Sequence, residues 1–302
     1  MSNPRYSISQ ITTLGASFAE DLAAYSSAGF AGVGIWELKL PEGGDGAALE
    51  ALAASGLEPA SAVPTIPSIL PLPLLGGPDD PAERMDSLAA SIHRLAAFGA
   101  PGIVCLTGTA EGRDRDDARA TVVDGLRTLA HEAELAGTRI ALEPYQADGG
   151  ALWTIAGSIP EALELIEEAG GSPALGLQFD VWHLWNTPEL ASDIPAAIDR
   201  IAGVHVADVR AETRGWADRV LPGDGIAEVP AILAALDSAG WSGLYDLEIF
   251  SDDGTFGASY PDSLWNVSAA ELAGRARRSL DAAWARRPAA VSTHQSKNKE
   301  DE

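Results

Sequence analysis

The chain of 302 residues contains one cysteine, few basic residues and no long apolar run. A single cysteine, Cys105, excludes an internal disulfide and a cysteine-rich zinc site. It lies in the apolar stretch IVCL, which predicts a buried core residue rather than a nucleophile. Because no run of roughly 18 apolar residues occurs, nothing is expected to span a membrane. The N-terminus, MSNPRYSISQ, lacks the basic start and apolar stretch of a signal peptide, so we expect a cytoplasmic protein.

Basic residues are scarce relative to acidic ones, with 20 Lys and Arg against 44 Asp and Glu and a formal net charge of -24. Such a field repels nucleic acid and anionic membrane surfaces, both of which bind basic proteins. A small anionic substrate needs only a local arginine or a metal ion and stays compatible with this charge. The expected partner is therefore a small molecule, and the oligomeric state, including a homo-oligomer, is left open.

Two nucleotide-binding patterns are also missing, the GxGxxG turn after a first strand and the P-loop. Instead, short apolar runs alternate with amphipathic stretches, several of which end on glycine as helices do. The runs predict strands at 5–11, 32–38, 58–64, 102–108, 139–145, 175–181, 203–209 and 244–250. The stretches between them predict helices, among them those at 18–29, 46–56, 81–99, 117–137, 158–170 and 229–240.

Eight strands in strict alternation with helices predict parallel pairing with right-handed crossovers. Eight such units close into a (β/α)8 TIM barrel of the α/β class, so we predict one domain over residues 1–288. An open, doubly wound sheet is the alternative. Residues 289–302 contain few apolar side chains and predict a disordered tail.

Single polar residues end several of the predicted strands. Successive strands, the fifth to the eighth, carry Glu143, Asp180, His205 and Glu248. In a barrel, these side chains would meet at the C-terminal mouth, where active sites form. Each one taken separately could be an ordinary hydrogen-bonding residue, but three converging carboxylates repel one another unless a cation compensates them. The set of oxygen ligands with one nitrogen suits Mn2+ best among divalent ions, with Mg2+ or Co2+ as alternatives.

The same residues lie in motifs that resemble those of the xylose-isomerase-like TIM barrels, the sugar phosphate isomerase/epimerase family. The motifs are ALEP at 141–144, FDVWH at 179–183, GVHVADVR at 203–210, LPGDG at 221–225 and LEIFS at 247–251, and the similarity extends over roughly residues 6–285. The resemblance implies that Glu143, Asp180, His205 and Glu248 bind one divalent metal ion. It also implies that His183 and Arg210 contact the substrate.

The resemblance further implies a sugar or polyol isomerase or epimerase. Such an enzyme removes a proton next to a carbonyl to give a cis-enediolate, with Glu143 and Glu248 acting on opposite sides of the substrate. His183 would hydrogen-bond the substrate oxygen, or else only orient Asp180.

Other functions remain open on this scaffold. One is a lyase on a keto-sugar or keto-inositol, including a subunit that cleaves C-glycosides of 3-keto sugars together with a small partner chain. A non-catalytic sugar-binding protein is another. The related nucleases that use three zinc ions are disfavoured, because the sequence DRV at 218–220 lacks their histidine.

Further candidates carry less weight. Lys39, close to Glu37, could contact substrate, although a surface ion pair is the simpler expectation. The loop at 145–153 has Asp148 as its only carboxylate. An aromatic wall against a sugar face and a site for an anionic group are further hypotheses, and they rest on Trp36, Trp153, Trp182 and Trp185 and on Arg210, Arg214 and Arg219.

Overall fold

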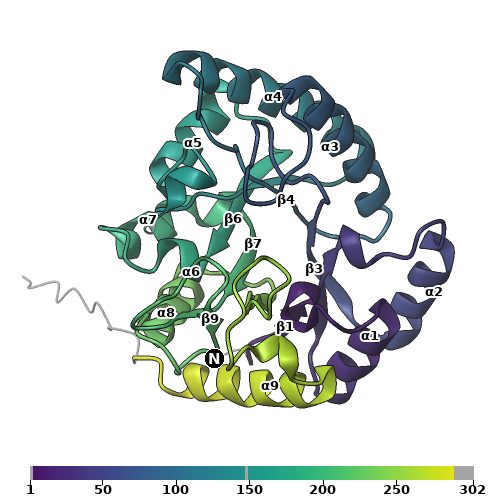
Figure 1. Cartoon of the computed structure of the whole chain (residues 1–302). Coiled ribbons are helices and arrows are strands. Elements are labelled where there is room, and N and C mark those ends of the chain that lie inside the picture. Colours follow the sequence, from purple (N-terminus) through teal and green to yellow (C-terminus); the bar gives the residue numbers. More distant parts are fainter. Residues whose placement is uncertain (1–2, 147–148, 289–302) are drawn as a thin grey trace, which may run out of the picture.

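Eight parallel strands form a closed barrel surrounded by helices in the computed structural model, which describes residues 3–146 and 149–288 (Figure 1). The predicted TIM barrel is therefore confirmed. The strands are β1 (Tyr6–Ser9), β2 (Gly32–Trp36), β3 (Glu58–Val63), β4 (Ile103–Cys105), β5 (Ile140–Leu142), β6 (Leu175–Asp180), β7 (Ile201–Val206) and β10 (Tyr245–Leu247). Strand β10 pairs with both β7 and β1, which closes the barrel. The predicted tail at 289–302 lies outside the described residues.

The helices pack on the outer face of the barrel. They are α1 (Phe18–Ser27), α2 (Asp45–Ser55), α3 (Pro81–Ala96), α4 (Arg115–Ala136), α5 (Ile159–Glu168), α6 (Val181–Leu184), α7 (Leu190–Ala197), α8 (Val229–Ala239) and α9 (Ala269–Ala285). Helix α9 contacts α1 and α8 and so completes the ring, close to the N-terminus (Figure 1). Within the described residues, no helix combines the length and the apolar character that crossing a membrane requires.

Local sequence signals explain where several helices begin and end. At the start of α1, the Ser17 side chain accepts from the Glu20 amide while the Glu20 carboxylate accepts from the Ser17 amide. This reciprocal capping box satisfies two amides that have no partner inside the helix. At the end of α4, Gly137 adopts φ 72°, a left-handed conformation that glycine tolerates without strain.

The main hydrophobic core lies between the barrel strands and the helices, as expected for strands that are buried on both faces. A second, smaller cluster covers the C-terminal mouth of the barrel. It consists of Ile11, Trp36, Val63, Val104, Ala217, Phe250 and Trp265, with Leu14 and Trp216 packed against it. Four aromatic rings are therefore among the residues that cover the mouth.

A small hairpin extends from the mouth after β7. Its strands, β8 (Asp208–Val209) and β9 (Arg219–Val220), pair antiparallel, and the loop between them carries Trp216. The Asp208 carboxylate accepts from the amides of Gly223, Gly225 and Ala227, which ties the hairpin to the LPGDG segment.

Candidate metal centre

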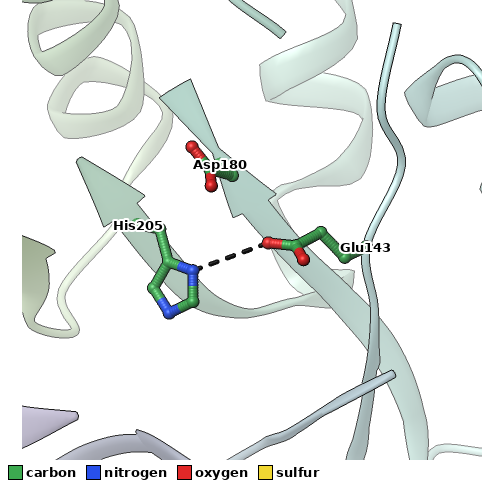
Figure 2. A group of neighbouring side chains, drawn as sticks. All are labelled: Glu143, Asp180 and His205. Atoms are coloured by element: carbon green, nitrogen blue, oxygen red, sulfur yellow. Dashed lines mark ion pairs between the residues drawn. The ribbon is translucent and has the colours of Figure 1, made fainter. Parts of the chain in front are cut away.

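Four neighbouring strands bring the four predicted metal ligands together at the mouth. Asp180 ends β6 and His205 lies within β7, directly paired with it in the sheet register. Glu143 follows β5, and Glu248 follows β10. All four residues are at least 95% buried. Figure 2 shows Glu143, Asp180 and His205 pointing toward one another from three successive strands.

The distances among these side chains fit a single cation. One ligand atom each from Glu143, Asp180 and His205 lies within 4.8 Å of the other two. Glu248 adds a fourth side chain, the third carboxylate, from the other side, because its Oε2 is 3.2 Å from His205 Nδ1, while Glu143 Oε1 is 3.5 Å from the same nitrogen. His205 Nδ1 therefore lies between two glutamates that reach it from β5 and β10.

Several buried polar atoms at this point have no hydrogen-bond partner. They are Glu143 Oε1, His183 Nδ1 and His205 Nδ1. Burying such atoms without a partner costs roughly 1–3 kcal/mol each. A divalent ion coordinated by the carboxylates and the His205 imidazole would satisfy two of the three, so the donor set fits such an ion.

The other ring nitrogen of His205, Nε2, contacts side chains that hold the ring in place. His205 Nε2 is 3.3 Å from Ser61 Oγ, and Ser61 donates to Asp246 Oδ2 at 2.9 Å. Because a metal-binding histidine is oriented by the partner of its other nitrogen, this pair aims Nδ1 at the glutamates. Asp246 was not singled out in the sequence. Asp246 and Glu248 are two residues apart along an apolar strand, and side chains at this spacing point to the same face. This spacing is the sequence signal that indicates a place for Asp246 in the barrel interior.

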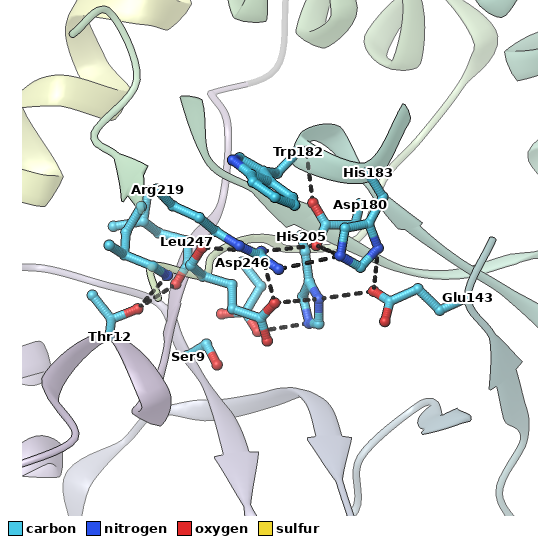
Figure 3. A network of polar contacts seen from close by, with 12 residues as sticks. Ser9, Thr12, Glu143, Asp180, Trp182, His183, His205, Arg219, Asp246 and Leu247 are labelled. Carbon is cyan, nitrogen blue, oxygen red and sulfur yellow. Dashed lines mark hydrogen bonds and ion pairs between the residues drawn. The ribbon is translucent and has the colours of Figure 1, made fainter. Parts of the chain in front are cut away.

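Arg219 is an additional charged member of the centre. Its side chain is 4% exposed, and Nη1 donates to Asp180 Oδ2 at 2.9 Å and to Glu248 Oε2 at 3.1 Å. Its Nη2 lies 3.2 Å from His183 Nε2 (Figure 3). The guanidinium is always a donor, so His183 Nε2 must accept and the ring proton is placed on Nδ1.

The charges of the centre shift the pKa values of its members. Burial raises the pKa of the Asp180 carboxyl, but the Arg219 guanidinium, with smaller contributions from the imidazoles of His183 and His205, lowers the pKa overall. The pKa of Glu248 is likewise lowered, with burial opposed mainly by His205 and Arg219. Burial alone would lower the pKa of His205, yet the neighbouring Glu248 and Glu143 raise it. Asp180 and Glu248 are thus carboxylates at neutral pH.

The other predicted substrate residues lie in different places. The ring of His183 stacks on Tyr145 with centroids 4.1 Å apart, and its Nδ1 is 3.7 Å from Glu143 Oε1, so it belongs to the centre. Arg210 does not reach it. Arg210 forms ion pairs with Asp218 on the hairpin and with Asp262, between β10 and α9, and is not among the residues that line the cavity.

Hairpin geometry explains this difference between the two arginines. Arg210 follows β8 immediately and lies on the outer loop, where Arg214 binds the same two aspartates. Arg219 is the first residue of β9, where the hairpin leads back to the barrel mouth. Arg219, nine residues after Arg210, is therefore the arginine that contacts the carboxylates of the centre.

Lys39 and Glu37 also have structural partners. Instead of the expected surface ion pair, Lys39 is buried, with Nζ 2.6 Å from Asp21 Oδ2, and it donates to the carbonyls of Gln10 and Thr13. Glu37 accepts from the Thr65 amide and from Ser91. Neither residue lines the cavity over the centre. Asp148 lies outside the described residues.

Comparison with known proteins gives the same fold. A structure of protein SMc04130 from Sinorhizobium meliloti 1021 is 25% identical, with a TM-score of 0.79 over 92% of this chain and 98% of that one. The IolI protein with a bound zinc atom is 21% identical, with a TM-score of 0.72 over 92% and 97%. The 3-keto-D-glucoside 4-epimerase YcjR from E. coli is 20% identical, with a TM-score of 0.71 over 93% and 99%.

No curated protein sequence matches the chain. The model of the xylose isomerase-like TIM barrel family, however, matches residues 22–282. This match covers most of the chain and includes all four residues that converge at the mouth. The chain belongs to the xylose isomerase-like TIM barrel family.

Proposed function

We propose that this protein is a divalent-metal-dependent isomerase or epimerase of a sugar or polyol-derived carbonyl compound. The observation that carries the proposal is the convergence of Glu143, Asp180, His205 and Glu248 on one buried point. Structural neighbours include L-ribulose 3-epimerase and D-allulose 3-epimerase, at 19% and 21% identity. They support the choice of reaction class.

Those four residues would hold the ion, and Mn2+ is the expected metal. When bound, such an ion supplies a Lewis acid for a carbonyl oxygen and a template for the neighbouring hydroxyl. Arg219 shares Asp180 and Glu248 with it and adds a fixed positive charge beside the same oxygens. Together they favour the development of negative charge on the substrate.

The two glutamates are proposed to move the proton. Glu248 removes the proton from the carbon next to the carbonyl, and the electron pair of the C–H bond forms the C=C bond of a cis-enediolate. Delivery of a proton through Glu143 from the opposite side inverts that carbon. Return to the neighbouring carbon instead interconverts an aldose and a ketose. Glu143 and Glu248 approach His205 Nδ1 from β5 and β10, which supports their placement on either side.

His183 is proposed to stabilise the oxygen that becomes negative. Arg219 donates to Nε2 of His183, so the ring proton lies on Nδ1 of His183 and faces the space beside Glu143. Stacking on Tyr145 fixes the plane of the ring. A donor held in this way needs no reorganisation when charge develops.

The test combines metal analysis with isotope exchange. The purified protein should contain or bind one divalent ion, and with Mn2+ it should exchange deuterium from D2O into the carbon next to the carbonyl of a ketose in a substrate panel. The variant Glu248→Gln should lose this exchange while its circular dichroism spectrum stays unchanged. Glu228→Gln, a change at an exposed glutamate, is the matched control and should exchange like the parent protein.

Other outcomes identify the alternatives. An unsaturated product or a released aglycone would establish a lyase. Absence of both metal and exchange would leave only a sugar-binding protein. Full exchange in Glu248→Gln would remove Glu248 from the proposed role of base.

A further inference from the structure

The cavity above the proposed metal centre has a largely apolar lining. Apart from the five ionisable side chains of the centre and Tyr145, every described residue that lines it is aliphatic or aromatic. The rings are Trp36, Trp153, Trp182, Trp216 and Phe250. Among the described lining residues, there is no serine, threonine, asparagine, glutamine or lysine.

These rings form a continuous wall. Trp216 packs edge-on against Trp153, with ring centroids 5.0 Å apart, and lies 5.5 Å from Phe250. Phe250 in turn packs against Trp36 at 5.6 Å. The Arg219 guanidinium lies 4.8 Å from the ring of Phe250, so the wall extends from the mouth to the charged centre.

Few polar groups on this wall can bind hydroxyl groups. The Trp36 indole N–H already donates to Ser9 Oγ at 2.8 Å. The Trp182 indole N–H is buried without a partner, so it is one donor that a ligand can satisfy. A free ketose carries a hydroxyl on almost every carbon, and each one buried without a partner weakens binding by roughly tenfold.

We infer that the substrate carries a flat, apolar ring beyond its reacting carbons, in contrast to a free, fully hydroxylated sugar. This inference rests on the proposed function, since the carbonyl and its adjacent hydroxyl face the metal centre. The ring then lies against Trp153, Trp216 and Phe250. Aromatic faces bind such a ring through both burial and stacking.

Trp216 is the specificity-determining residue in this arrangement. Trp216 is partly exposed and lies on the loop between β8 and β9, whereas the other rings are more than 90% buried. A ring that enters from solvent therefore packs against Trp216.

A matched pair of ligands tests the inference. Dihydroxyacetone and 2-hydroxyacetophenone present the same carbonyl and adjacent hydroxyl, but the second has a phenyl ring in place of a hydroxymethyl group. Isothermal titration calorimetry of the full chain loaded with Mn2+ should show at least about tenfold tighter binding of 2-hydroxyacetophenone. Trp216→Ala should reduce that preference to less than about threefold.

The control and the contrary results separate this inference from the proposed function. Trp241→Ala removes a partly exposed tryptophan next to Pro4 and Asp237, outside the cavity, and should keep the full preference. Trp216→Gln replaces the ring with a hydrogen-bonding group and should lose the preference even if Trp216→Ala is unstable. Equal binding of both ligands by the metal-loaded parent protein would overturn the inference and leave the function standing. If no metal binds and neither ligand binds, both fail.

Discussion

Arg219 is a buried arginine that pairs with two of the proposed metal ligands. It supplies a buried positive charge to Asp180 and Glu248, the two carboxylates that a metal ion would also use. Removing one member of a buried ion pair leaves the other charges uncompensated, which typically destabilises a protein by about 3–5 kcal/mol. Arg219 and a bound ion would thus stabilise the same carboxylates.

This parallel role predicts how metal and Arg219 interact. In the presence of a chelator, Arg219→Met should lower the free energy of unfolding by roughly 3 kcal/mol or more. Addition of Mn2+ should stabilise Arg219→Met more than it stabilises the parent protein, because the ion replaces the missing charge. Urea unfolding with chelator or with Mn2+ measures both effects. Equal metal-induced stabilisation of the two proteins would contradict the prediction, and Arg113→Met, at an exposed position, serves as the control.

Cys105 gives a second prediction at the residue scale. It is fully buried in β4, and burial raises the pKa of its thiol to about 12. At pH 8 the group is therefore a neutral thiol, which does not react as a nucleophile. Iodoacetamide should leave the native protein unlabelled and modify one site only after denaturation, as mass spectrometry will show. Rapid labelling of the folded protein would place Cys105 in an accessible environment and contradict the structure.

Sequence patterns located the four convergent residues because each one interrupts or ends an apolar strand. Strand alternation and the barrel then dictate that Glu143, Asp180, His205 and Glu248 share one mouth. The position of Arg219 did not follow in the same way. Nothing local distinguishes it from Arg210, because the difference depends on where the hairpin turns back. Lys39 was unpredictable for a similar reason, since its buried partner Asp21 comes from a different part of the chain.

At the scale of elements, the segment between β3 and α3 shows how the mouth is built. It contributes Pro67 and Leu75 to the cavity wall and is held by Arg84, which is completely buried. The Arg84 guanidinium donates to the carbonyls of Ser68, Gly76 and Pro78 and to the Ser68 hydroxyl. One helix residue therefore fixes both ends of a long loop.

Loss of Arg84 should accordingly destabilise the protein. Arg84→Met leaves several buried carbonyl groups without a donor and should reduce the free energy of unfolding by about 2–4 kcal/mol. Arg115→Met, at the exposed start of α4, should change it by less than about 0.5 kcal/mol. Chemical denaturation of both variants provides the measurement. Similar stability of the two would show that the loop needs no such anchor.

At the scale of the whole molecule, the net charge of -24 is the dominant feature. Like charges spread over a compact surface repel one another, and dissolved salt screens this repulsion. The melting temperature should therefore rise by several degrees as NaCl increases from about 10 mM to about 300 mM. Tetramethylammonium chloride should give the same rise, since screening does not depend on the identity of the cation. A flat or falling curve in both salts would contradict the expectation.

Gly34 of β2 contributes nothing to the proposed metal centre, yet it lies next to Asp246, which helps to hold the ring of His205. A methyl group added at Gly34 would come within 2.1 Å of Asp246 Oδ2, the oxygen that accepts from Ser61 beneath His205. A Gly34→Ala change would hence press on the ring of a proposed ligand while leaving all four ligands intact. We therefore expect a substitution on β2, which contributes none of the proposed ligands, to change metal affinity, and a comparison of the ligands alone would not reveal that change.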